Sequence, residues 1–211
     1  ARPIRCRCIC GDGIEARAEH TQTFQQRLNQ ILPKLTSQDL LQNRGLGNEI
    51  GFWIFEYPPE HELEMRGFLH EVVEPALAKR LPPLRAATVD LFQLLIGVLE
   101  ERKLLDKVLA MQQTQGDAKT LESVRRVLKE DRLAQRIVDQ HKPDELDLLI
   151  LSGVGAAYPM LRTHTLLSAL HPLMKDTPLL MLFPGRYDGY SLRLFNKLSD
   201  NHYYRAFRLV A

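Results

Sequence analysis

Polar residues that could support chemistry follow three apolar runs of the sequence. Glu56 and Tyr57 close one run, a pair of glycines follows the second, and an arginine–aspartate turn follows the third. Open α/β sheets bind ligands beyond the carboxyl ends of their strands, so these residues are expected to line one rim. The candidate ligand residues are Glu56, Tyr57, Gly153, Gly155, Arg162, His164, Arg186 and Asp188.

These residues match no established catalytic fingerprint. Gly153 and Gly155 form only the first half of G-x-G-x-x-G, and the third position is Tyr158, whose bulk opposes the close approach of a dinucleotide. The sequence contains no G-x-x-x-x-G-K-[ST], and Ser152 lacks the G-x-S-x-G frame of a nucleophile elbow. We therefore expect a non-enzymatic protein with no catalytic residues, no metal site and no cofactor.

A phosphate or nucleotide site at the 153–162 turn is the alternative. Arg162 and His164 could meet a phosphate near the start of a helix. His164 is more often a partly buried structural residue. Asp188 could pair with Arg186, although an aspartate in such a turn commonly caps the turn itself.

The elements that must position this rim alternate between strands and helices. The run Leu146–Ser152, almost continuously aliphatic and stopped by glycine, predicts a strand that is buried on both faces. Helices are predicted at 157–174 and 190–197. The five predicted strands lie near 51–57, 85–91, 146–152, 178–183 and 203–210.

This alternation predicts one α/β domain over residues 21–211. We expect three layers around a five-stranded, mostly parallel, doubly wound sheet, Rossmann-like with a degenerate P-loop position. The predicted strand order is 2-1-3-4-5, with 146–152 and 178–183 inside and the last strand at an edge. A helical insertion at about 92–141 should protrude as a helix pair or a lid.

Composition and the N-terminal residues narrow the cellular setting. Lys and Arg total 28 against 26 Asp and Glu, so the balance of charge does not by itself indicate nucleic acid. No apolar run is long enough to span a bilayer, and no secretory signal is visible, which favours a cytoplasmic protein without a membrane partner. Residues 1–20 are expected to be a disordered tail or a non-native extension. Cys6, Cys8 and Cys10 lie there without a fourth zinc ligand at a familiar spacing.

Two segments could contact macromolecules. The segment 117–141 predicts a charged helix whose basic residues are a possible DNA contact, although interleaved acidic residues dilute the positive field. The last strand combines aromatic residues with arginines, a composition enriched in protein interfaces. The basic residues are Arg125, Arg126, Lys129, Arg132 and Arg136; the candidate partner interface is Tyr203, Tyr204, Arg205, Phe207 and Arg208.

Several short stretches, taken in order, resemble the BrxB family of bacterial BREX phage-defence systems. The stretches are GLGNEI (45–50), FEYPPEHEL (55–63), LF (91–92), LEER (99–102), SGVGAAYP (152–159), RTH (162–164), FPGRYDG (183–189), SL (191–192), LF (194–195) and NHYYRAFRL (201–209). The resemblance extends from about residue 24 to the end, and it is specific because the order and spacing of the stretches agree.

The resemblance implies a cytoplasmic subunit encoded beside a methyltransferase, an ATPase and a PglZ-type alkaline-phosphatase-like protein. Such systems methylate host DNA and block phage replication. The implied role is an adaptor that binds the PglZ-type subunit, with the methyltransferase and the ATPase as further candidate partners. Direct contact with DNA is left open, and the resemblance carries over no catalytic residues.

Overall fold

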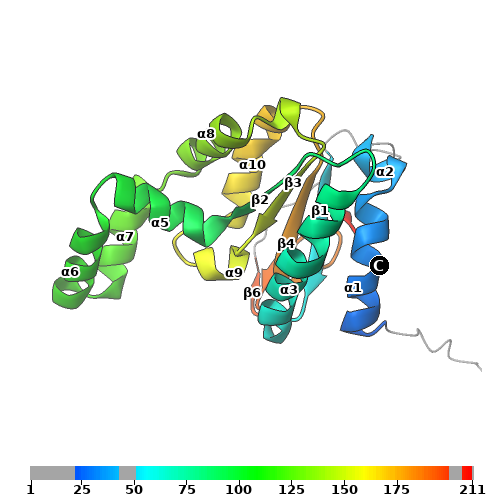
Figure 1. The fold of residues 1–211 in the computed structure, drawn as a ribbon. Coiled ribbons are helices and arrows are strands. Elements are labelled where there is room, and N and C mark those ends of the chain that lie inside the picture. Colours follow the sequence, from blue (N-terminus) through cyan, green and yellow to red (C-terminus); the bar gives the residue numbers. More distant parts are fainter. Residues whose placement is uncertain (1–21, 43–50, 200–205, 211) are drawn as a thin grey trace, which may run out of the picture.

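A computed structural model describes residues 22–42, 51–199 and 206–210 of the chain. The expectations for residues 1–20 and for Tyr203, Tyr204 and Arg205 lie outside the described residues. A twisted sheet separates two groups of helices, and a pair of helices projects away from it on one side (Figure 1). The predicted α/β architecture, a mostly parallel sheet with helices, is confirmed.

Five strands form the parallel part of the sheet, in the order β2-β3-β4-β1-β7. Each corresponds to one of the predicted strands. They span Phe52–Tyr57 (β1), Ala86–Asp90 (β2), Leu148–Ser152 (β3), Leu179–Tyr187 (β4) and Phe207–Arg208 (β7). Every residue of β3 is buried, as the apolar run predicts.

The predicted strand order is wrong. Numbered along the chain, the five parallel strands lie in the order 2-3-4-1-5, because β1 pairs with β4 and not with β2. The predicted inside position of β3 and β4 is confirmed, and β7 lies at an edge of the described sheet. The apolar pattern identifies buried strands, but it holds no information on which buried strand lies beside which.

Two further short strands lie at the carboxyl end of β4, so the structure describes seven strands where five were expected. β5 (Leu192–Leu194) pairs antiparallel with the end of β4, and β6 (Leu198–Ser199) pairs with β5. The helix predicted at 190–197 is therefore wrong. The alternation of buried and exposed residues along Leu192, Arg193 and Leu194 is the signal for a strand in this segment.

Alternate residues of the strands enter two separate cores. In β3, Leu149 and Leu151 face one core, whereas Leu148 and Ile150 face the other. The second core is covered by helices of the N-terminal part of the chain: α1 (Phe24–Leu35), α2 (Gln38–Leu41), α3 (Glu62–Phe68) and α4 (Glu74–Lys79), with a π-helical turn (Leu69–Val73) between the last two. Thr23 starts α1 by a capping box with Gln26.

The first core is covered by helices from the later part of the chain. These are α5 (Leu91–Glu101), α8 (Glu130–His141), the short α9 (Val154–Ala157) and α10 (Thr163–Met174). The single helix expected at 117–141 is two helices, because the chain leaves helical geometry at Leu128, where φ is −92° and ψ is 54°. The helix predicted at 157–174 begins only at Thr163, and Pro159 lies between α9 and α10.

The helices α6 (Leu105–Gln115) and α7 (Asp117–Val127) form an arm that projects away from the sheet (Figure 1). No residue of α6 is buried. The helical insertion predicted at 92–141 is thus divided: α5 and α8 cover the sheet, whereas the α6–α7 arm protrudes and is joined to the first core through Val124 of α7.

Gly185 gives a test of this fold. A Cβ atom at this position would lie 2.1 Å from the Arg193 carbonyl oxygen and 2.9 Å from the Phe183 ring. We predict that Gly185→Ala lowers the free energy of unfolding by about 1–3 kcal/mol, measured by urea denaturation. Gly97→Ala is the control, because no atom lies within 4 Å of its Cβ position. Equal losses in the two variants would contradict the observed β4–β5 pairing.

Candidate functional site

Glu56 lies at the carboxyl end of β1 and its carboxylate joins three other segments. Its Oε1 atom lies 3.0 Å from Nε of Arg208 in β7 and 4.0 Å from a terminal nitrogen of Arg27 in α1. Its Oε2 atom accepts a hydrogen bond from the backbone N–H of Tyr187 in β4. The Glu56 side chain is only 13% exposed, so it forms a partly buried ionic junction between β1, β4, β7 and α1.

The two arginines of this junction also bind the backbone. Arg208 donates to the Tyr187 carbonyl oxygen, and Arg27 donates to the Val210 carbonyl oxygen at 3.5 Å. The guanidinium of Arg27 lies over the Phe55 ring, 5.1 Å from its centroid. Burial lowers the pKa of Arg27, and the neighbouring Glu56 carboxylate opposes that effect. Arg27 is not among the residues predicted for the rim, because α1 is distant from those residues in the sequence.

Tyr57 points into the second core and not toward a ligand space. Its hydroxyl donates a 2.5 Å hydrogen bond to Glu62, and its ring lies near those of Phe24 and Phe55. Burial, followed by the negative charge of Glu62, raises the pKa of Tyr57. This tyrosine therefore stays protonated at physiological pH and fastens the start of α3 to β1.

The glycine turn after β3 is closely packed by the protein itself. Gly153 has a φ of 68°, and a Cβ there would lie 2.6 Å from a carboxylate oxygen of Asp90, which caps α5 through the N–H of Gln93. A Cβ on Gly155 would lie 3.0 Å from both Phe195 and Pro184. The two glycines thus leave space for side chains of the protein itself. The alternative hypothesis had placed a bound phosphate at this turn.

The remaining candidate ligand residues are not part of the Glu56 junction. Arg162 is exposed in the residue before α10, and His164 is half-buried in its first turn. Arg186 is exposed on β4. Asp188 accepts hydrogen bonds from the N–H groups of Tyr190 and Ser191 and from the Ser191 hydroxyl, at 2.7–2.9 Å. Asp188 is therefore a turn-capping residue, the commoner of the two roles considered above.

Two residues of the candidate partner interface have contacts within the chain. Phe207 lies near Trp53, with 5.6 Å between ring centroids, and Arg208 belongs to the Glu56 junction. The structure thus brings Glu56 and Arg208 together, although they belong to different predicted sets. The two residues are far apart in the sequence, and one was assigned to the ligand rim and the other to the partner interface. Their pairing was therefore not predicted.

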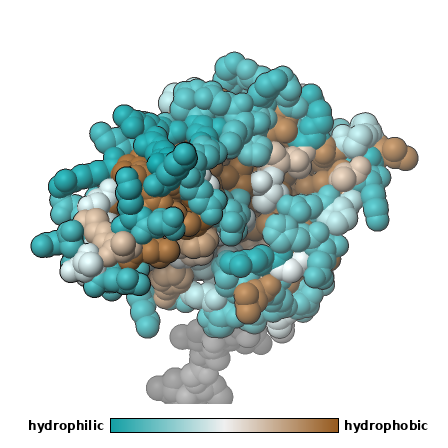
Figure 2. Space-filling model, turned by 60° about the vertical axis from the view of Figure 1, so that its left-hand side comes forward, coloured by the Kyte–Doolittle hydropathy of each residue, from teal (hydrophilic) through white to brown (hydrophobic). Residues whose placement is uncertain are grey.

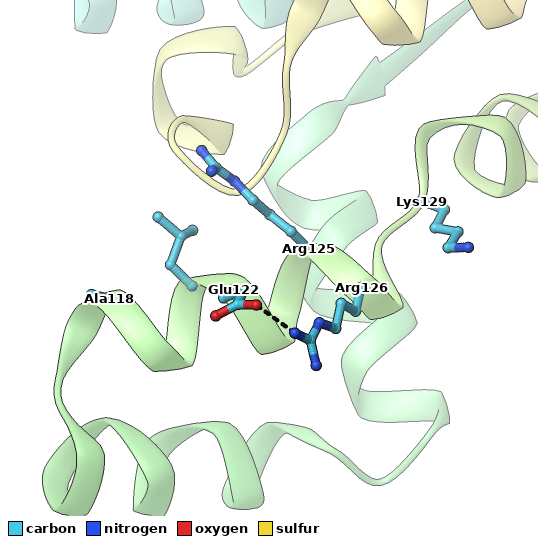
Figure 3. Close-up of a pocket in the computed structure, with 6 residues that line it drawn as sticks. Ala118, Glu122, Arg125, Arg126 and Lys129 are labelled. Carbon is cyan, nitrogen blue, oxygen red and sulfur yellow. Dashed lines mark hydrogen bonds and ion pairs between the residues drawn. The ribbon is translucent and has the colours of Figure 1, made fainter.

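The basic residues of 117–141 are only partly available to nucleic acid. Arg125 crosses to the loop between α9 and α10 and donates two hydrogen bonds to the Pro159 carbonyl oxygen, at 3.0 and 2.6 Å (Figure 3). Arg126 pairs with Glu122 along α7, and Arg136 pairs with Glu101 of α5. The helix break at Leu128 also divides the basic residues between two helices, so they do not form one continuous basic face.

A shallow groove of about 390 Å³ runs along α7 on the arm. Ala118 and Leu121 supply its apolar part, and Glu122, Arg125, Arg126 and Lys129 supply its charged part (Figure 3). Leu109 on α6 is 51% exposed. Hydrophobic side chains gather among hydrophilic ones when the arm side of the molecule is turned forward (Figure 2). These features are typical of a surface that binds another protein.

Residues 22–42, 51–199 and 206–210 hold no group of three or more His, Cys, Asp or Glu side chains that could bind a metal ion. None of the helices in this part of the chain combines the length and the apolar character that a bilayer crossing requires. The three cysteines lie outside these ranges.

The fold and its packed rim define an α/β-sheet protein with a projecting helical arm. The chain belongs to the BrxB family, because the family profile described as "BREX protein BrxB" matches residues 87–209. It is 40% identical over 189 residues to a BREX protein BrxB of Bacillus cereus (strain H3081.97), covering 88% of this chain and 96% of that protein. The predicted family is therefore confirmed, and the chain is a component of a BREX system.

A second relative agrees with this assignment. The chain is 37% identical over 187 residues to a BREX protein BrxB of Escherichia coli O9:H4 (strain HS), covering 89% of this chain and 92% of that protein. No solved structure matches the chain. Antiviral defence follows from membership in a BREX system.

Glu56→Gln tests the ionic junction. The amide keeps the shape of the side chain but removes the negative charge, leaving Arg27 and Arg208 partly buried without their counter-charge. We predict a loss of about 1–3 kcal/mol in the free energy of unfolding, measured by chemical denaturation. Glu64→Gln is the control: Glu64 pairs with His61 at 2.9 Å but is 46% exposed, so its loss should stay under about 1 kcal/mol. Equal effects would show that the junction does not stabilise the fold.

Asp188 predicts a pH dependence at low pH. The hydrogen bonds from the backbone N–H groups of Ser191 and Tyr190 and from the Ser191 hydroxyl lower the pKa of Asp188 from 3.8 to about 2. The folded state binds this proton less readily than the unfolded state, so the stabilisation is complete above about pH 4 and is lost as the pH falls toward 2. We predict that Asp188→Asn lowers the melting temperature at neutral pH and reduces the steepness of its decline between pH 4 and 2. Unchanged melting curves would contradict this assignment.

Proposed function

We propose that this chain is a non-catalytic assembly subunit of a BREX complex that binds the PglZ-type alkaline-phosphatase-like subunit. In this role it supports host DNA methylation and phage restriction without performing either reaction. It acts in the cytoplasm, and the methyltransferase and ATPase subunits of the same system are further candidate partners. Membership in the BrxB family supports the setting.

The α6–α7 arm is the observation that carries this proposal. It projects from the sheet, has no buried residue in α6, and presents the exposed Leu109 beside a helix that carries an apolar groove with a charged border. Exposing apolar side chains on a projecting element costs free energy that binding to a partner can recover. The arm lies within the segment 92–141, which the sequence predicts to protrude.

The rim of the sheet supports an assembly role over the alternative of a phosphate or nucleotide site. Phe195 and Pro184 pack against Gly155, where the alternative needs space for a phosphate. Arg162 is exposed and does not join the Glu56 junction. Calorimetry with ATP, GTP or NAD at millimolar concentration tests the alternative, and binding that is lost in Arg162→Ala would revive it.

The proposal predicts a stoichiometric complex with the genomically adjacent PglZ-type protein, measured by pull-down and light scattering. The double variant Leu109→Glu/Leu121→Glu should weaken that complex by about tenfold or more, because it places charge in the apolar contact. Leu81→Glu is the matched control, since Leu81 is 92% exposed in the α4–β2 connection and lies outside the arm.

Circular dichroism of both variants controls for loss of the fold. Failure of the folded wild-type chain to bind would contradict the adaptor role. Binding that is equal in the double variant and in the Leu81→Glu control would move the contact away from the arm.

A further inference from the structure

Two arginines face each other on the outer side of the β4–β5 hairpin. Arg186 of β4 lies directly opposite Arg193 of β5, and both side chains are exposed. Their strand neighbours Tyr187, Leu192 and Leu194 are buried. Because alternate residues of a strand point to opposite faces, both arginine side chains extend from the same face of the hairpin. Their Cβ atoms are about 5 Å apart.

The positive charge of this pair is poorly compensated. Within the part of the chain that the structure describes, neither guanidinium has a hydrogen bond or an ion pair. Asp188 is close enough for an electrostatic interaction with Arg193, but its carboxylate already accepts three hydrogen bonds that close the turn. Like charges directly opposite each other on a sheet are destabilising, so an external anion between them would relieve a repulsion that the free protein bears.

The hairpin holds the pair on a rigid support. Gly185 allows the Arg193 carbonyl to approach β4 closely. The Tyr187 hydroxyl lies 2.8 Å from the Ala206 carbonyl oxygen and 2.9 Å from the Gly189 carbonyl oxygen, so its single proton is shared between these two acceptors. The paired strands fix the spacing of the two Cα atoms, so binding of a carboxylate by both guanidinium groups has to order only the two side chains.

We propose that the outer face of the β4–β5 hairpin binds the carboxylates of an acidic segment on a partner protein. Tyr190 in the adjoining turn is 69% exposed, and tyrosine with arginine is the composition of interface centres. The site is compact and includes the negative Asp188, whereas duplex DNA requires an extended run of phosphate contacts. The inference rests on the proposed function in one respect, namely that the partner is a protein subunit of the same complex.

The test is the double variant Arg186→Glu/Arg193→Glu, with affinity for the PglZ-type protein measured at low and high salt. Reversing both charges should weaken binding by about tenfold or more and remove most of its salt dependence. The control Lys34→Glu/Lys79→Glu makes the same change in net charge at two exposed positions away from the hairpin, and should bind within about twofold of wild type.

A single variant separates binding from folding. Arg193→Gln removes one of the two facing charges, so it should keep or raise the melting temperature while it weakens binding. If Arg193 had a merely structural role, its replacement would lower both the melting temperature and the affinity. A stable Arg193→Gln variant with wild-type affinity would overturn the inference.

The possible outcomes distinguish this inference from the adaptor role. If wild type binds the PglZ-type protein and the double variant binds equally well, the hairpin inference is wrong and the adaptor role stands. If wild type does not bind, the adaptor role is wrong and labelled polyglutamate decides the hairpin site: binding lost in the double variant upholds it, and no binding overturns it. Tighter binding of duplex DNA than of polyglutamate through the same two arginines would overturn the choice of a protein partner.

Discussion

The partly buried carboxylate of Glu56 is the constraint on which the carboxyl end of the sheet depends. A carboxylate that is 13% exposed at the end of a central strand requires both counter-charge and hydrogen-bond donors. Arg27 of α1, Arg208 of β7 and the Tyr187 N–H of β4 supply them. The first helix, the last strand and the two adjacent central strands are thereby fixed together, although they are far apart in the sequence.

The Glu56 junction is one of several contacts by which the rim of the sheet is closed by the protein itself. The sequence had instead predicted that the candidate ligand residues line a binding site there. Charged groups at the ends of parallel strands ordinarily suggest a binding crevice. Here Glu56 stabilises the fold, Asp188 closes a turn, and Phe195 and Pro184 pack against Gly155. Exposed charged and apolar side chains occur on the α6–α7 arm and on the outer face of the β4–β5 hairpin, which directs attention from a small ligand toward a macromolecular partner.

The candidate site was predictable only in part. Residue type and position correctly indicated that Glu56, Arg186 and Asp188 lie near strand ends. The turn expected at 184–189 is wrong in its first part, because β4 continues to Tyr187 and the turn begins at Asp188. The partners of these residues could not be predicted. Arg27 and Arg208 reach Glu56 from separate elements, and Arg193 faces Arg186 only because residues 192–194 form a strand where a helix was expected. A short segment with two leucines is compatible with a helix or with a strand. Its pairing with β4 determines that it forms a strand.

The sequence by itself determined the family, the α/β class, the five parallel strands and the burial of β3 and β4. These properties follow from local apolar runs and glycine stops, whose free energies depend on neighbours in the chain. Tertiary structure alone decided the strand order, the division of 92–141 into a sheet-covering part and an arm, and the closure of the rim. Those features depend on which side chains meet across long sequence separations, as Glu56 and Arg208 do, and no local pattern encodes such pairs.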